Sequence, residues 1–256
     1  ERLAALGWQE LYTYSMVGEQ LANESGHGVD QHLQLANPLT DDKVYLRRSL
    51  VPSLLQIAQN SDSTKKSESK FFEIANVYHP QENQLPQEAL TLTLLTNASL
   101  IELKTNLTEL LQTFYLKLPS VSQVEGETAK YGNLVTITMV RPGWLAATID
   151  VASFVKQVKT HPTYQPIPRY PAIIEDLTFT VPEKTGLGQL LDHIQAVDPL
   201  IESVRLGAQY RQNCTYTITF RAKDAALSAA EIAPIRTKIV QSVAETFAAQ
   251  LVGSLA

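Results

Sequence analysis

Cysteine and long apolar runs are scarce in this chain. Its 256 residues include one cysteine, Cys214, and no stretch approaches the roughly 20 consecutive apolar residues of a membrane-spanning helix. A single cysteine cannot form an intramolecular disulfide, and the chain start, ERLAALGWQE, lacks the basic residues and apolar centre of a secretion signal. We therefore expect a cytoplasmic protein in a reducing compartment, with Cys214 packed in or beside a strand and no contact with a membrane.

Sequence signatures of catalysis are also missing. The Gly-Leu-Gly at 186–188 has no third glycine for a dinucleotide site, and neither a Walker sequence nor a G-x-S-x-G nucleophile turn occurs. The histidines stand apart from cysteines and carboxylates at metal-binding spacing. We expect no catalytic residue and no metal site in this chain.

Residues 35–60, LANPLTDDKVYLRRSLVPSLLQIAQN, indicate a turn followed by a helix. Asn37-Pro38 favours a turn because the residue before proline is pushed out of the α region. Ser49 is placed to cap the helix, and Pro52 falls early enough to lose no intrahelical bond. We expect a capped helical rod over residues 46–60.

This helix carries a wide apolar surface. Its apolar positions share or adjoin one face: Leu50, Val51, Leu54, Leu55, Ile57 and Ala58. A surface this wide exceeds one core contact, so we expect the helix to bury two of its sides. An ordinary internal core is the alternative, and it is the commoner fate of an amphipathic helix.

A buried strand is predicted over residues 70–78, KFFEIANVY, from its aromatic and β-branched alternation. Glu73 is a carboxylate in this apolar setting. Burial would raise its pKa unless it pairs with an arginine such as Arg47, which we expect instead.

The first half of the chain predicts an α+β domain with a mostly antiparallel sheet. Further strands are expected at 91–96, 134–140 and 144–151, separated by turns or one helix. Four prolines then concentrate between residues 156 and 171, in a segment that cannot hold a helix. We place a first domain at 1–158, a linker at 159–171 and a second domain at 172–256.

The second domain has a β-α-β-β-α element order, which is typical of a ferredoxin-like fold. The expected elements are strand 173–181, helix 187–197, strands 201–210 and 214–222, helix 228–251 and LVGSLA as a closing strand. Ser228 and Glu231 have capping-box spacing at the start of the last helix.

Four segments taken together resemble the beta subunit of bacterial-type phenylalanyl-tRNA synthetase. They are GWQELYTYSMV (7–17), LANPL (35–39), LRRSLVPSLLQIAQN (46–60) and FFEIANVY (71–78), in the order of that family. From Pro168 onward the chain is similar to the ferredoxin-like anticodon-binding domain that closes this subunit. The resemblance covers essentially the whole chain and implies a C-terminal portion of the subunit, preceded in relatives by several domains.

The resemblance implies a class II synthetase-like module without catalytic function, followed by an anticodon-binding domain. Phenylalanine, ATP and Mg²⁺ would be used in the alpha subunit of a heterotetramer, so this chain alone is expected to be inactive, to position tRNA(Phe) and to bind no DNA. The helix residues expected to meet the alpha subunit are Leu50, Leu54, Leu55, Ile57 and Ala58. A stand-alone ferredoxin-like regulatory or ligand-binding module fused to an α+β domain is the alternative.

The net charge of the second domain does not favour RNA contact. Residues 164–256 carry 8 Lys and Arg against 9 Asp and Glu, a net charge of −1, whereas phosphate binders are basic. A local patch of guanidinium and aromatic groups remains as the candidate: Arg169, Tyr170, Arg205, Tyr210, Arg211 and Arg221. The alternative is that these are ordinary surface arginines and half-buried tyrosines.

Overall fold

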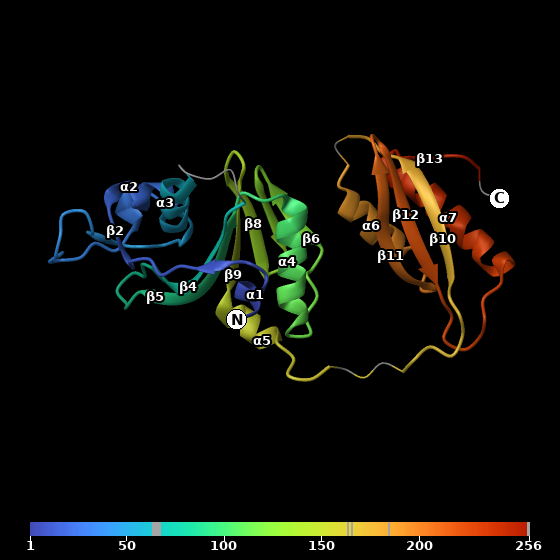
Figure 1. Ribbon diagram of the computed structural model, residues 1–256, viewed down its shortest axis with the longest axis horizontal. Helices are drawn as coiled ribbons and strands as arrows, with labels where there is room; N and C mark the ends of the chain where they lie inside the picture. Colours follow the sequence, from blue (N-terminus) through green and yellow to red (C-terminus); the bar gives the residue numbers. More distant parts are fainter. Residues whose placement is uncertain (63–67, 163, 165, 184, 255–256) are drawn as a thin grey trace. The chain divides into compact units, whose positions relative to one another are not determined.

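The computed structural model of the chain describes residues 1–62, 68–162, 164, 166–183 and 185–254 (Figure 1). It forms two compact units, Glu1–Pro162 and Thr163–Ala256. Each unit combines helices with a largely antiparallel sheet, which confirms the expected α+β class. The division falls inside the proline-rich segment 159–171, whose described residues form neither helix nor strand.

A seven-stranded sheet forms the centre of the N-terminal unit. Its order is β1-β4-β5-β9-β8-β7-β6. The strands are β1 Gln9–Glu10, β4 Lys70–His79, β5 Gln87–Thr96, β6 Val121–Glu125, β7 Thr128–Tyr131, β8 Val135–Arg141 and β9 Trp144–Asp150. β1 runs parallel to β4, and the other described pairs are antiparallel, as expected.

Two hydrophobic cores lie on opposite faces of this sheet. Successive strand residues point to opposite faces, and Phe71 packs in one core with Leu54 while Phe72 packs in the other with Leu107. Figure 1 shows α3 and α4, which supply these leucines, on either side of the strands. The helices are α1 Arg2–Ala5, α2 Glu19–Glu24, η1 Val29–Gln31, α3 Val51–Asp62, α4 Leu100–Gln112 and α5 Val151–Gln157.

Helix α3 begins later than the sequence pattern predicts. Leu46 lies in a short strand, β3 Tyr45–Leu46, which pairs with β2 Met16–Val17. Arg47 forms a buried ion pair, and residues 47–50 are neither helix nor strand. The Ser49 hydroxyl accepts a hydrogen bond from the Val51 amide at 3.2 Å. The expected rod over 46–60 is therefore wrong for its first five residues, 46–50.

The C-terminal unit has the ferredoxin-like order expected from the sequence. Its sheet runs β11-β12-β10-β13, and its neighbouring strands are antiparallel. The elements are β10 Ile173–Thr180, α6 Leu187–Ala196, β11 Ile201–Tyr210, β12 Asn213–Phe220, α7 Ala229–Phe247 and β13 Gln250–Leu251. Alternate β12 residues such as Tyr216 and Ile218 are buried in one core with Ile232 and Ile239 of α7.

The end of the chain differs in detail from the expectation. Ser228 and Glu231 form the predicted capping box of α7. The helix ends at Phe247 rather than at 251, because Ala248 adopts a left-handed conformation with φ of 51°. The closing strand is therefore Gln250–Leu251, earlier and shorter than the predicted LVGSLA.

Candidate functional site

Four of the five predicted interface residues are buried inside this chain. Leu50, Leu54, Leu55 and Ala58 belong to the core that also contains Phe71, Leu95 and Trp144. Ile57 is half-buried and, with Ser53 and Gln56, lines a groove at the edge of this core-facing side of α3. Contact of α3 with another subunit stays a prediction, and a charge at Leu54 would test folding rather than assembly.

A groove of about 600 Å³ runs beside the outer side of α3. We call it the Tyr14 groove; it is lined by Tyr12, Thr13, Tyr14, Met16, Val17, Gly18, Glu19, Gln20, Leu21, Asp41, Asp42, Lys43, Ser53, Gln56 and Ile57. Tyr12 and Tyr14 are 85% and 68% exposed, although both follow a strand at the edge of the sheet. Neither tyrosine was among the predicted interface residues. The alternation of tyrosines in LYTY is the sequence signal that could have indicated them.

A buried ion pair fixes the backbone that carries these tyrosines. Arg47 Nη1 lies 3.1 Å from Glu73 Oε1, and both side chains are about 97% buried. The same guanidinium donates to the Thr13 hydroxyl at 2.8 Å, and that hydroxyl donates to Glu73 Oε2 at 2.8 Å. Arg47 also donates to the Asn76 carbonyl at 2.9 Å. The predicted pairing of Glu73 with Arg47 is confirmed, and it joins three chain segments.

The charges around the Tyr14 groove are mostly negative. Glu19, Asp41 and Asp42 line it, and Lys43 is the one basic residue among its lining residues. The Thr40 hydroxyl and a backbone amide donate to Asp42, which lowers the pKa of this carboxyl below its usual range. The Lys43 Nζ lies 3.5 Å from the centroid of the Tyr14 ring. Asp42 is therefore ionised at neutral pH, and one ring of the groove already attracts a cation.

Tyr210 and Arg211 lie at one end of the C-terminal sheet. Tyr210 ends β11 and is 69% exposed, and the Arg211 guanidinium lies 5.4 Å from its ring centroid. Arg205 pairs in register with Thr217 of β12, whose hydroxyl donates to Asp176 at 2.6 Å. These register partners point away from the helices, since the alternate β12 residues are buried against them.

The other three predicted RNA contacts lie at the opposite end of this sheet. Arg221 donates to Glu202 at 2.9 Å and to the Tyr170 carbonyl at 2.6 Å, so its guanidinium is engaged within the unit. Arg169 is exposed beside it. Residues 213 and 221 are roughly 26 Å apart along an extended strand. The six residues therefore do not form one patch, and Tyr210, Arg211 and Arg205 are the better placed for a common ligand.

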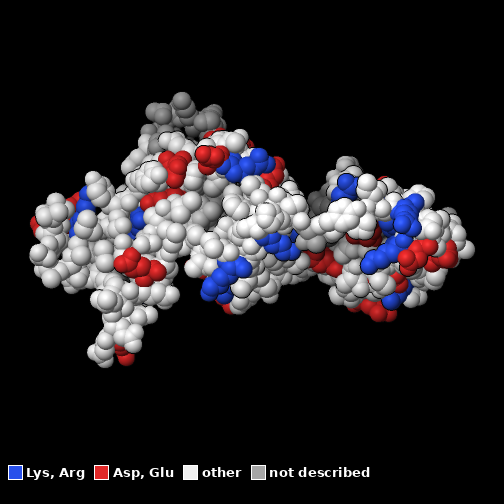
Figure 2. Space-filling view, turned by 90° about the horizontal axis from the view of Figure 1, so that it is seen from below, with Lys and Arg blue, Asp and Glu red and all other residues white. Residues whose placement is uncertain are grey.

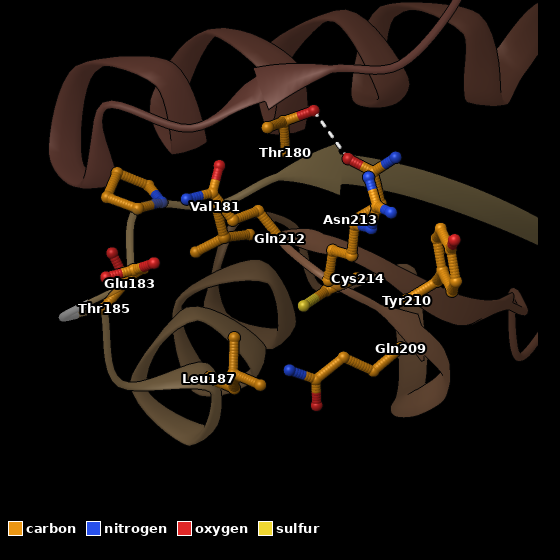
Figure 3. A pocket seen from close by; sticks show the side chains of 12 residues that line it. Thr180, Val181, Glu183, Thr185, Leu187, Gln209, Tyr210, Gln212, Asn213 and Cys214 are labelled. Atoms are coloured by element: carbon orange, nitrogen blue, oxygen red, sulfur yellow. Dashed lines mark hydrogen bonds between the residues drawn. The ribbon is translucent and has the colours of Figure 1, made fainter.

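A cavity of about 850 Å³ opens at the Tyr210 end of the unit (Figure 3). In Figure 3, Leu187, Gln209 and Cys214 reach toward one space, and Thr180 donates to Asn213 at 2.8 Å. Burial raises the pKa of the Cys214 thiol, which keeps it protonated. The lining amides of Gln209, Gln212 and Asn213 were not predicted, because glutamine and asparagine in a hairpin give no distinctive sequence signal.

The surface charges of the C-terminal unit are mixed. On the face shown in Figure 2, its lysine and arginine side chains adjoin acidic ones. Two ion pairs of this unit join Arg221 to Glu202 and Arg236 to Glu175. Binding of RNA here would therefore depend on stacking and hydrogen bonds more than on net charge.

The part of the chain that the structure describes contains neither a metal-type cluster nor a membrane-spanning helix. No group of three or more His, Cys, Asp and Glu side chains is arranged to hold a metal ion there. Within the same residues, no helix is both long and apolar enough to span a membrane.

Two protein families match this chain. The phenylalanyl tRNA synthetase beta chain CLM domain matches residues 1–123, and the ferredoxin-fold anticodon binding domain matches residues 168–251. The two matches fall in the two structural units.

Curated relatives named phenylalanine–tRNA ligase beta subunit match over most of the chain. The relatives from Symbiobacterium thermophilum and Moorella thermoacetica are each 25% identical, over 94% and 98% of this chain. A relative from Carboxydothermus hydrogenoformans is 36% identical over 34% of this chain and 11% of its own length. The chain spans only 32% and 37% of the first two relatives.

Among solved structures, a pyrrolysyl tRNA synthetase, PylSc, from Desulfitobacterium hafniense is similar with a TM-score of 0.47 and 17% identity. The similarity covers 60% of this chain and 62% of that chain. A similarity at this level carries no argument about fold or function.

Proposed function

Because the chain belongs to the family of phenylalanyl-tRNA synthetase beta subunits, we propose that it assembles with an alpha subunit and helps to position tRNA(Phe). The order of the two matched domains along one chain is the observation that carries this proposal. The same order disfavours the alternative of a stand-alone ferredoxin-like regulatory or ligand-binding module. We propose that the complex works in the cytoplasm as a heterotetramer.

Aminoacylation is assigned to the alpha subunit in this proposal. Phenylalanine, ATP and Mg²⁺ would bind there, with the metal offsetting the negative charge of the phosphates. Our chain contributes packing and RNA contacts.

Co-expression tests the assembly. The chain, joined to the upstream part of the subunit from the same organism, is expected to co-purify with the alpha subunit and to charge tRNA with phenylalanine. The chain alone should not charge tRNA. Failure of the two subunits to associate, with both folded by circular dichroism, would overturn the proposal.

RNA positioning is supported by the exposed Tyr210 ring and by Arg205 on the uncovered sheet face. Stacking of an unpaired base contributes about 1–3 kcal/mol, so Tyr210→Ala should weaken tRNA(Phe) binding about tenfold. Tyr210→Phe keeps the ring and should bind nearly as wild type. Filter binding by the assembled complex at two salt concentrations provides the measurement.

Arg205→Ala separates phosphate contact from stacking. Loss of one phosphate contact to a single strand should reduce the salt slope by about 0.7. Arg141→Ala, an exposed arginine of the N-terminal unit, is the matched control. Equal slopes for both variants would remove Arg205 from the RNA surface.

A further inference from the structure

We infer that the Tyr14 groove receives a segment of the alpha subunit that presents an arginine flanked by apolar side chains. This inference rests on the proposed assembly with an alpha subunit and names the chemistry of the contact. It concerns the side of α3 that faces away from the core containing Leu54.

The shape and composition of the groove favour an inserted peptide segment. Two large aromatic side chains, Tyr12 and Tyr14, stand exposed on its rim, while Ile57 and Met16 are half-buried in it. Leu39 is 93% exposed and lies two residues before Asp41 in the loop that lines the groove. Aromatic and aliphatic groups gathered around a hollow are typical of a protein interface, where such rings often anchor binding.

The charges select the occupant. Glu19 begins α2 and Asp41 lies in the loop before β3, and together with Asp42 they outnumber the single lysine of the groove. Residues 1–162 carry 13 Lys and Arg against 17 Asp and Glu, so the whole unit is acidic. Charge complementarity therefore favours a basic segment and disfavours an acidic one.

Arginine fits this groove better than lysine. A guanidinium is planar, stacks on aromatic faces and forms two parallel hydrogen bonds to a carboxylate. Tyr14 already attracts the Lys43 ammonium at 3.5 Å, which shows that its ring face is accessible to a cation. An incoming guanidinium would displace Lys43 from the ring, so Lys43 acts as an internal competitor.

The Arg47–Glu73 pair holds the groove in place. Arg47 donates a hydrogen bond to the Thr13 hydroxyl at 2.8 Å, and Glu73 accepts one from the Thr13 amide at 3.1 Å. Thr13 lies between the two tyrosines, and it is half-buried whereas Tyr12 and Tyr14 are exposed. Anchoring Thr13 inward therefore directs Tyr12 and Tyr14 outward, and Arg47 is a positioning residue for the docking surface.

Charge reversal tests the groove in the co-expressed complex. The double substitution Glu19→Lys and Asp41→Lys should weaken association with the alpha subunit by about tenfold or more, because two attractions to a basic segment become two repulsions. The matched control is Glu125→Lys with Glu127→Lys, two exposed carboxylates at the β6–β7 turn of the same unit. It should associate as wild type, measured by biolayer interferometry at 50 and 500 mM NaCl.

Two further variants distinguish a cation from an apolar anchor. Lys43→Ala removes the internal competitor and should strengthen association about twofold or more. Tyr14→Leu keeps apolar area but removes the ring, and it should weaken association several-fold. Weaker binding by Lys43→Ala, or wild-type binding by Tyr14→Leu, would overturn the cationic occupant.

The outcomes separate this inference from the proposed function. A wild-type chain that forms no complex with the alpha subunit contradicts the proposed assembly. In a second outcome, the wild-type complex forms, and neither the groove variants nor the Glu125 and Glu127 control changes its affinity. That outcome leaves the proposed assembly intact and overturns the Tyr14 groove as the docking surface. Thermal unfolding of each variant shows whether the fold is retained.

Discussion

The two units of this chain bury very different interiors. Among the described residues, the N-terminal unit buries the polar side chains His32, Arg47, Ser53, Glu73, Thr91, Thr93, Thr96 and Asn106, whereas the C-terminal unit buries Thr219. A buried ion pair is weak evidence of stability, but it penalises every arrangement that separates its partners. The N-terminal unit thus gains defined placement of chain segments, while the C-terminal unit is held by apolar packing.

Removing one partner of the buried pair is the strongest test of this contrast. Glu73→Ala leaves the Arg47 guanidinium buried without a carboxylate, which should destabilise the fold by about 3–5 kcal/mol. Urea unfolding gives the magnitude, and hydrogen exchange read by mass spectrometry should place the lost protection in residues 1–162.

An exposed pair of the same unit provides the control. Arg2 and Glu109 approach to 3.2 Å but are 47% and 40% exposed. Glu109→Ala should therefore change stability by less than about 1 kcal/mol. Equal losses for Glu73→Ala and Glu109→Ala would show that burial of the Arg47 pair has no special consequence.

Leu190→Ala is the corresponding change in the C-terminal unit. Leu190 of α6 is fully buried with Phe179 and Tyr216, and truncating a buried leucine costs about 2–5 kcal/mol, with about 3 kcal/mol expected here. The lost protection should fall in residues 163–256. Leu206→Ala, at a position 40% exposed, should have a much smaller effect, and a comparable loss would contradict the packing argument.

The capping box of α7 is a smaller contribution to the same unit. The Ser228 amide donates to the Glu231 carboxylate at 2.8 Å, and the hydroxyl donates to it at 2.7 Å. Ser228→Ala should destabilise the chain by about 1 kcal/mol, while Ser228→Thr, which retains a hydroxyl, should lose less. Equal urea midpoints for wild type and Ser228→Ala would show that the capping box does not contribute to stability.

Much of both folds follows from local patterns. The alternation of CTYTITF places Tyr216 and Ile218 in the core, and the spacing of Ile232, Ile235 and Ile239 places one side of α7 on the sheet. These predictions succeed because strand and helix periodicity directly records which side is buried. The pairing of Glu73 with Arg47 follows because a buried carboxylate requires a partner.

The candidate sites are harder to predict from the sequence. They depend on the register of the strands and on which surfaces stay exposed after the core has packed. Leu54, Leu55 and Ala58 of α3, together with Leu50 just before the helix, are buried in the internal core. The groove on the outer side of α3 is lined instead by Ile57 and by the distant Tyr14. Arg211 and Arg221 are near in sequence, yet β12 carries them to opposite ends of the sheet. No local pattern contains either fact.

The smallest expected effect concerns two histidines of the N-terminal unit. Partial burial, and secondarily the positive charge of Arg48, lowers the pKa of His27 and of His79 below the usual value near 6.5. A group whose pKa is lowered by folding binds fewer protons in the folded state, so its contribution to stability is complete above about pH 6.5 and is lost as the pH falls through the lowered value.

The thermal midpoint should therefore fall slightly between pH 7.5 and pH 5.5. The double variant His27→Gln and His79→Gln should show a flatter profile over that range. Arg48 donates to the Gln31 carbonyl at 2.9 Å. Protonation of His27 and His79 would therefore add positive charge near Arg48 and the segment around Gln31. Hydrogen exchange should report the first acid-induced opening there. A pH profile identical for wild type and the double variant would mean that these two rings do not link protonation to the stability of the N-terminal unit.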